Sequence, residues 1–276
     1  MIKPNFIIAV GGSMVPDMKK IEQLKQSVIE SNNILPYINL NEKNEYKGWV
    51  TDFHIQFLDG SKMELNLTKE EDLFLLFVLA VAWSRSGRWE NAAYFVTYLK
   101  YNQLDHISDW MNLEKVEKLK KDRYVEVNRL TDYCVGLEPR IKISFRKDIY
   151  DSIVVLANNW KSIKAVLEES NKQGDYVKFI QFIRNLKGLG VNDKKMNIKI
   201  LLILRELRCQ RVYCNIPGEL CCVPDERVKK ACENLAIKLP ATTSTSGLIK
   251  ASKTLYDYFG DQYDIPPFAY EDLMSC

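Results

Sequence analysis

Two lysines and one aspartate are the residues of this 276-residue chain whose types and spacing best suit chemistry. Lys194 and Lys195 begin the segment "KKMNIKILLIL", which has the apolar pattern of a helix. At a helix start, the dipole and a neighbouring ammonium both favour a neutral amine, and a neutral amine is a nucleophile. Asp225 follows Lys194 by 31 residues and begins another helical segment, "CVPDERVKKAC". The sequence therefore predicts a reactive lysine that works with a carboxylate.

The apolar phase of the helix separates the two lysines. If Lys194 is the nucleophile, the alternate positions after it are all apolar: Met196, Ile198 and Ile200. If Lys195 is the nucleophile, those positions include Asn197 and Lys199. We therefore expect Lys194 to be the reactive residue. Two plainer alternatives stay open: adjacent lysines are usually solvated phosphate contacts, and Asp225 has the position of a helix N-cap.

A glycine turn precedes the lysines. Gly188 and Gly190 lie in "KGLGVNDKKM", between helical patterns near 175–186 and 195–208. Glycine adopts backbone conformations closed to other residues, and the amide groups of such a turn, beside a helix start, suit a phosphate. This outline is that of a helix-hairpin-helix, which binds the DNA backbone without sequence preference. The alternative is an ordinary interhelical turn in which glycine ends the first helix.

Basic residues are concentrated around this turn. Residues 184–211 carry eight lysines and arginines against two acidic residues, a net charge of +6 that leaves −3 for the rest of the chain. A local excess of this kind indicates an anionic partner, of which phosphate is the commonest. The remaining alternative is a solvated face on a helical interaction protein.

Cysteine and histidine usage disfavours several classes of site. The chain has seven cysteines and no Cys-x2-Cys pair. Its only two histidines, His54 and His106, are far in sequence from the clustered cysteines, which are Cys209, Cys214, Cys221 and Cys222. We therefore expect reduced thiols, no metal and no cofactor, and little room for histidine-based catalysis. The longest apolar run, residues 73–83, is about half of what a bilayer requires. These features predict a soluble intracellular protein.

The elements that must position the lysine and the aspartate are mostly helical. Residues 49–67 alternate around Asp59-Gly60 and predict a β-hairpin. Thr68 and Glu71 have the spacing of a capping box that opens the first apolar helix. From there on the pattern is helical, with segments near 88–103, 106–119, 148–169, 175–186, 195–208, from 225 and 246–259. We expect a mainly α protein with an N-terminal mixed α/β segment, 1–67, and a helical core, 68–276.

The combination of "GLG", a lysine and "VPDERV" resembles the helix-hairpin-helix DNA glycosylase superfamily. Within it, the long interval from Lys194 to Asp225 is most similar to the archaeal 8-oxoguanine DNA glycosylase (AGOG) branch. The resemblance covers about residues 175–274, with an echo in "WSRSGRWENAAYF". It implies two helical subdomains flanking a cleft. It also implies a bifunctional glycosylase and AP lyase that excises 8-oxoguanine from damaged double-stranded DNA.

The resemblance also assigns roles to residues. Lys194 would attack C1′ of the flipped nucleotide to form a Schiff base that leads to β-elimination, and Asp225 would stabilise positive charge on the sugar. The implied DNA-binding residues are Lys187, Gly188, Gly190, Lys195 and Lys199. The implied base-recognition residues are Trp83, Trp89, Phe268, Glu271 and Asp272. Core packing is the alternative for each aromatic residue.

The chain departs from the family pattern in its tryptophans. Ser275 stands where one base-stacking tryptophan is expected, and Trp89 is offset from the other. Only Cys232 and Cys276 follow Asp225, so no iron–sulfur cluster is implied. We expect a monomer without membrane association, in the cytoplasm, at the nucleoid of a prokaryote or in the nucleus of a eukaryote. A non-catalytic helix-hairpin-helix module for DNA or RNA is the main alternative function.

Overall fold

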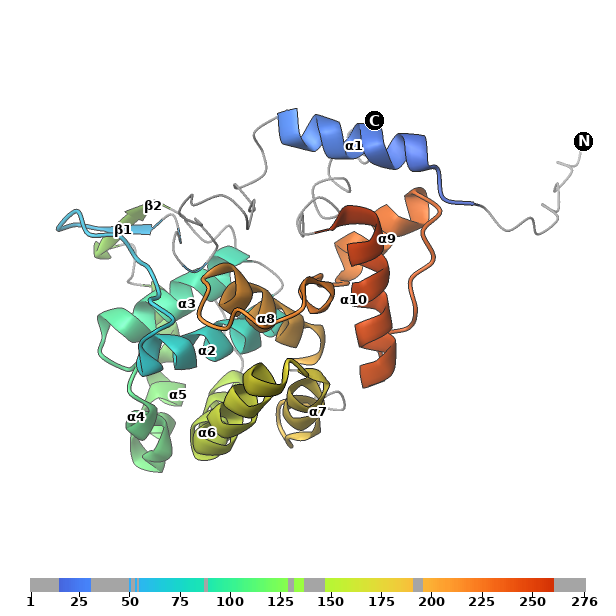
Figure 1. Cartoon of the computed structure of the whole chain (residues 1–276). Helices are drawn as coiled ribbons and strands as arrows, with labels where there is room; N and C mark the ends of the chain where they lie inside the picture. Colours follow the sequence, from blue (N-terminus) through green and yellow to red (C-terminus); the bar gives the residue numbers. More distant parts are fainter. Residues whose placement is uncertain are drawn as a thin grey trace, which may run out of the picture.

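The fold is mainly helical, with one small two-stranded sheet (Figure 1). The computed structural model describes residues 15–30, 50, 53, 55–86, 89–128, 132–136, 147–190 and 196–260. Its α-helices are α1 (Met18–Glu30), α2 (Glu70–Ser86), α3 (Trp89–Tyr101), α4 (Ile107–Met111), α5 (Leu113–Asn128), α6 (Lys147–Gln173), α7 (Val177–Asn185), α8 (Ile200–Cys209), α9 (Glu226–Asn234) and α10 (Thr245–Phe259). The strands are β1 (Ile55–Phe57) and β2 (Cys134–Gly136), and two 3₁₀ turns are η2 (Asn197–Lys199) and η3 (Gly218–Leu220). The expected mainly α class is confirmed.

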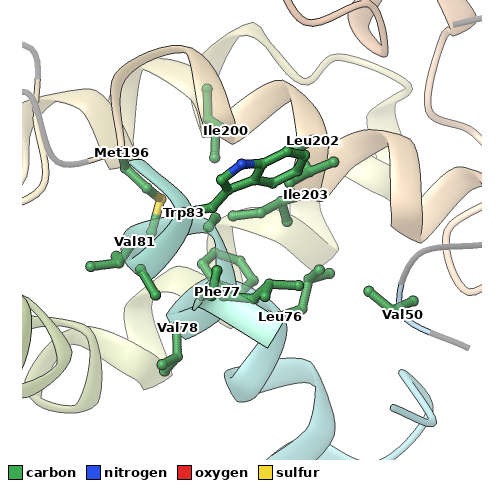
Figure 2. Close-up of a cluster of buried hydrophobic side chains, with 14 of the residues drawn as sticks. Val50, Leu76, Phe77, Val78, Val81, Trp83, Met196, Ile200, Leu202 and Ile203 are labelled. Carbon is green, nitrogen blue, oxygen red and sulfur yellow. The ribbon is translucent and has the colours of Figure 1, made fainter. Parts of the chain in front are cut away.

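Helix α2 forms the centre of the core. It is apolar on every side, and its residues from Leu73 to Trp83 are all buried, as expected for a helix surrounded by other elements. It packs against α3, α6 and α8. Figure 2 shows how Leu76 and Phe77 of α2 approach Ile203 of α8. Helix α2, which carries Trp83, and helix α8, which follows Lys199, therefore share one packed interface.

The start of α2 differs from the sequence-based expectation. Thr68 does not cap the helix, because its hydroxyl donates to Asn66 Oδ1 at 2.6 Å and the helix begins two residues later, at Glu70. Acidic side chains in the first turn, Glu70, Glu71 and Asp72, complement the helix dipole instead. The predicted capping box is therefore wrong at this site.

The predicted β-hairpin is confirmed over a short stretch around Asp59-Gly60, where Met63 N also donates to the Ile55 carbonyl at 2.9 Å. Gly60 takes a φ of +85°, and Phe57 N donates to the carbonyl of Ser61 at 2.8 Å. However, β1 forms its ladder with β2, antiparallel, whereas Gln56 and Lys62 form only an isolated bridge. The chain after the turn leaves the sheet because its alternating apolar residues enter the helical core: Met63, Leu65 and Leu67. Beyond Met63, the alternation of apolar and polar residues at Leu65 and Leu67 reflects burial in the core and not strand pairing.

The helical segments on both sides of the glycine turn are confirmed, with one change at the second. The turn follows α7. The structure is described again from Met196, the N-cap of η2, and α8 follows η2. Gly188 has a φ of +92°, a conformation that L side chains rarely adopt. A Cβ atom at Gly190 would clash with the carbonyl oxygen of Arg184. Both glycines are therefore required by the geometry of the turn itself.

Candidate active site

Lys199 and Asp225 form the most chemically distinctive pair in the described structure. Lys199 is the last residue of η2 and the N-cap of α8, and Asp225 is the N-cap of α9. Lys199 Nζ lies 3.8 Å from Asp225 Oδ2, a separation typical of an ion pair and longer than a hydrogen bond. The fold thus places two helix starts side by side, with an amine on one and a carboxylate on the other.

The Lys199 amine lies in a largely water-free environment. Its side chain is 11% exposed, and Nζ lies 4.0 Å from the centroid of the Trp83 ring. Burial lowers the pKa of Lys199 to about 8; the Asp225 carboxylate opposes this change, whereas the Arg205 and Arg227 guanidinium groups add to it. Burial prevails because the ammonium loses its hydration and gains only a distant counter-ion. A large share of the amine is consequently neutral near pH 8, as a nucleophile requires.

Asp225 has two roles that use its two oxygens. Oδ1 accepts a hydrogen bond from Val228 N at 3.0 Å and so caps α9. Oδ2 faces Lys199 and also lies 3.9 Å from Arg227 Nη2. The N-cap interpretation is confirmed, and it does not exclude chemistry, because the second oxygen stays directed at the amine.

A cleft of about 350 Å³ opens over this pair. Its lining combines the charged groups with residues of α2 and η2: Trp83, Ser84, Asn197, Ile198, Lys199, Asp225, Glu226 and Arg227. The volume lies within the range of small-ligand sites. Arg227, 44% exposed on its side chain, places positive charge at the rim. Asp225 and Glu226 balance Lys199 and Arg227 in the lining, so the cleft suits a ligand that meets the Arg227 cation at the rim and extends a small group to the Lys199 amine.

Lys199 lines the cleft with its side chain against Trp83 and Asp225, 11% exposed. Its expected contact with DNA phosphates stays a prediction. Lys194 and Lys195 lie outside the described residues. The sequence signal for Lys199 is its position as the last polar residue before "ILLIL". A prediction that assumes α-helical periodicity misses Lys199, because Lys199 lies in η2, a 3₁₀ turn with fewer residues per turn than an α-helix.

In the glycine turn, Gly190 serves the turn itself, whereas Lys187 is exposed on its surface. Gly190 N donates to the carbonyl of Leu186 at 3.0 Å, so this N–H is used inside the turn. Contact of Lys187 and Gly188 with DNA phosphates stays a prediction.

The two tryptophans proposed for base recognition differ in position. Trp83 lines the cleft and supports Lys199, whereas Trp89 is outside the lining. The Trp89 ring stacks on Phe53 with centroids 5.5 Å apart and meets Trp83 edge-on at 5.1 Å. Trp89 thus packs against Trp83 without lining the cleft. Base recognition by the C-terminal residues Phe268, Glu271 and Asp272 falls outside the described residues.

Neither metal ligands nor a membrane-spanning element stands out in the described ranges. No three histidine, cysteine, aspartate or glutamate side chains gather there as a metal site. Six cysteines are described, all as thiols, and burial raises the pKa of Cys134 and Cys232. No described helix combines the length and hydropathy needed to cross a bilayer.

Comparison with known proteins gives no match, whether to family models, to curated proteins or to solved structures. Function is therefore inferred from the side chains of the cleft and their geometry.

Proposed function

We propose that this protein is a DNA glycosylase and AP lyase that excises an oxidised purine, with 8-oxoguanine as the expected lesion and Lys199 as the nucleophile. One observation carries the proposal: a buried amine with a pKa near 8 lies 3.8 Å from a carboxylate in a cleft. We assign to Lys199 the role first expected of Lys194, because among the described lysines Lys199 is the one that faces Asp225 in the cleft. The interval to Asp225 becomes 26 residues instead of 31.

The chemistry follows from the two groups. The damaged nucleotide leaves the base stack, because its C1′ is unreachable inside a duplex. As the bond from C1′ to the base breaks, Asp225 stabilises the positive charge that develops on the sugar. The neutral amine of Lys199 forms a bond to C1′, and the departing base takes up a proton. Opening of the sugar ring then gives a Schiff base.

Strand cleavage completes the reaction. The Schiff base acidifies the C2′ proton, and loss of that proton expels the 3′ phosphate by β-elimination. Water hydrolyses the remaining imine and regenerates the amine. No step requires an oxidant, a reductant or a metal ion.

The protein surface around the cleft supports DNA as the partner. Arg227 at the rim and exposed Lys187 on the glycine turn are available for phosphates. Met196 N, just before η2, donates to the carbonyl of Leu189 in the turn at 3.1 Å, so a backbone held by the turn would lie near η2 and the cleft that η2 lines. We expect binding that weakens steeply with salt, since each phosphate contact releases a counter-ion.

A non-catalytic phosphate clamp is the competing function. A clamp needs ammonium groups at the surface, whereas the lysine beside Asp225 is buried and its pKa is lowered. This burial is unfavourable for a clamp and favourable for a nucleophile.

Borohydride trapping separates the two functions. The protein is incubated with duplexes that carry 8-oxoguanine, uracil or an abasic site, and imines are reduced to stable adducts. We expect an adduct with the 8-oxoguanine and abasic duplexes that is lost in Lys199→Gln and retained in Lys172→Gln, an exposed lysine at the end of α6, outside the cleft lining and the glycine turn. Salt-sensitive binding without any adduct would instead establish the clamp.

A further inference from the structure

Arg184, on the last turn of α7, is a buried arginine that contacts neither Lys199 nor Asp225. Only 4% of it is exposed, and burial lowers its pKa. Nη1 donates to Asn197 Oδ1 at 3.0 Å and to Asn197 O at 3.4 Å. Nη2 donates to the carbonyls of Thr242 at 3.3 Å and Thr243 at 3.0 Å. One side chain therefore joins three segments that are distant in sequence.

The first of these contacts leads to the amine. Asn197 lies two residues before Lys199, in the 3₁₀ turn η2. Neither η2 nor the start of α8 has a side-chain cap. Arg184 does not replace a cap, since a guanidinium only donates; it engages the two acceptors of Asn197, its side-chain oxygen and its carbonyl. The hydrogen bonds from Arg184 hold the turn that carries Lys199.

The second contact leads to the carboxylate. Thr242 and Thr243 precede α10, which begins at Thr245. Within α10, Ser252 Oγ accepts a hydrogen bond from Cys222 N at 3.2 Å. Cys222 lies three residues before Asp225. The guanidinium is thus connected to Lys199 directly through η2, and to Asp225 by a longer path through α10, Ser252 and Cys222.

The glycine turn fixes the backbone of the same arginine. Gly190 approaches the Arg184 carbonyl oxygen so closely that a Cβ atom would not fit. An arginine also suits this position better than a lysine. Its rigid planar fork can reach acceptors on two sides at once, whereas an ammonium is a compact point charge.

We propose that Arg184 is a positioning residue that sets the separation of the Lys199 amine from the Asp225 carboxylate and keeps the amine away from water. Its catalytic consequence rests on the function proposed above, but the geometric effect does not. If the turn loosens, the amine is hydrated again, and burial no longer lowers its pKa. The charged groups that face the amine stay the same: Asp225, Arg205 and Arg227.

Amine labelling without DNA tests the proposal. Reaction of Lys199 with acetic anhydride is followed by peptide mass spectrometry from pH 6 to 11, and the midpoint reports its pKa. We expect a midpoint near 8 in the native protein and a rise of about one unit or more in Arg184→Lys, toward the normal lysine value. Asn197→Ala, a milder change at the same contact, shifts the midpoint in the same direction by less.

Arg208→Lys is the matched control, because Arg208 also donates a guanidinium hydrogen bond to a carbonyl, that of Ile216. We expect it to reduce stability and leave the Lys199 midpoint unchanged. An unchanged midpoint in folded Arg184→Lys and Asn197→Ala, or an equal rise in Arg208→Lys, overturns the proposal.

The trapping rate at pH 8 on an abasic duplex is then measured for the same variants, and it falls about tenfold in Arg184→Lys. A midpoint that shifts in a protein forming no adduct would keep the positioning role and reject the glycosylase function.

Discussion

Lys199 has a largely buried amine with a lowered pKa, and both follow from its surroundings. The Trp83 ring and the cleft walls remove water from the ammonium, and Asp225 is too distant to compensate fully. A group of this kind reduces stability at neutral pH and gains reactivity in return, a common trade at functional sites.

The stability contribution of Lys199 has a defined pH dependence. Its pKa is near 8 in the folded protein and 10.5 ordinarily. Below pH 8 the amine is charged in both states, so Lys199→Met should raise the free energy of unfolding by on the order of 2–3 kcal/mol. Between pH 8 and 10.5 the folded state releases its proton first, so the native protein becomes more stable relative to the variant, and the difference disappears. Urea unfolding at pH 7 and pH 10.5 measures this; a difference independent of pH contradicts it.

Asp225 allows its cap and its charge to be separated. Asparagine caps helices about as well as aspartate does, so Asp225→Asn should keep the cap of α9 and destabilise only through the loss of the charge that faces the Lys199 ammonium. Asp225→Ala loses the cap of α9 as well and should destabilise by about 1 kcal/mol more. Both variants should reduce lesion excision by at least about 100-fold, because the neutral side chain cannot stabilise the sugar cation. Excision by Asp225→Asn at the native rate would reduce Asp225 to a structural cap.

At the scale of elements, the sequence predicted helices better than their first turns. The apolar patterns of α2, α7 and α8 identified these helices because burial dominates their sequences. The 3₁₀ turn η2 was not foreseen, because its short sequence also fits an α-helical period. Lys199, in that turn, was therefore not singled out as the lysine beside Asp225. The partner of β1 was missed because β2 is distant in sequence.

Alanine substitutions at Gly190 and Gly174 separate the destabilisation caused by a steric clash from that caused by backbone strain. Gly190→Ala should destabilise the protein by more than about 2 kcal/mol, because its Cβ would collide with the backbone carbonyl of Arg184. Gly174→Ala is the control: its φ is +67° with no atom within 4 Å, so only strain of about 1 kcal/mol is expected. Urea denaturation gives both values. Equal effects would mean that the turn relaxes around Gly190.

At the scale of the whole molecule, the segment before α2 and the helices share a core. Phe53, Ile55 and Leu65 belong to the same buried cluster as α2 and α8. Lys100 of α3 also donates to the Glu64 carbonyl at 2.8 Å. The division at residue 67 is therefore a change of sequence pattern within packed structure. Composition predicts such a change, but not whether the two parts pack together.

This shared core predicts a single unfolding transition. Leu65 is 1% exposed and Leu58 is 69% exposed. Leu65→Ala should lower the free energy of unfolding by about 2–4 kcal/mol and shift the whole transition, whereas Leu58→Ala should have little effect. Circular dichroism at a helical wavelength follows the helices of the chain together, α2 and α8 among them. A helical signal that keeps its native midpoint in Leu65→Ala would show that the N-terminal segment unfolds on its own.

The central claim is that Lys199, facing Asp225, is the amine that reacts with DNA. The most direct measurement reduces the protein with borohydride on an abasic duplex, digests the adduct and locates the modified lysine by mass spectrometry. The modified residue should be Lys199, with no adduct in Lys199→Gln and an undiminished adduct in Lys194→Gln and Lys195→Gln. A deoxyribose attached to Lys194 or Lys195, or an adduct that persists in Lys199→Gln, would contradict the assignment.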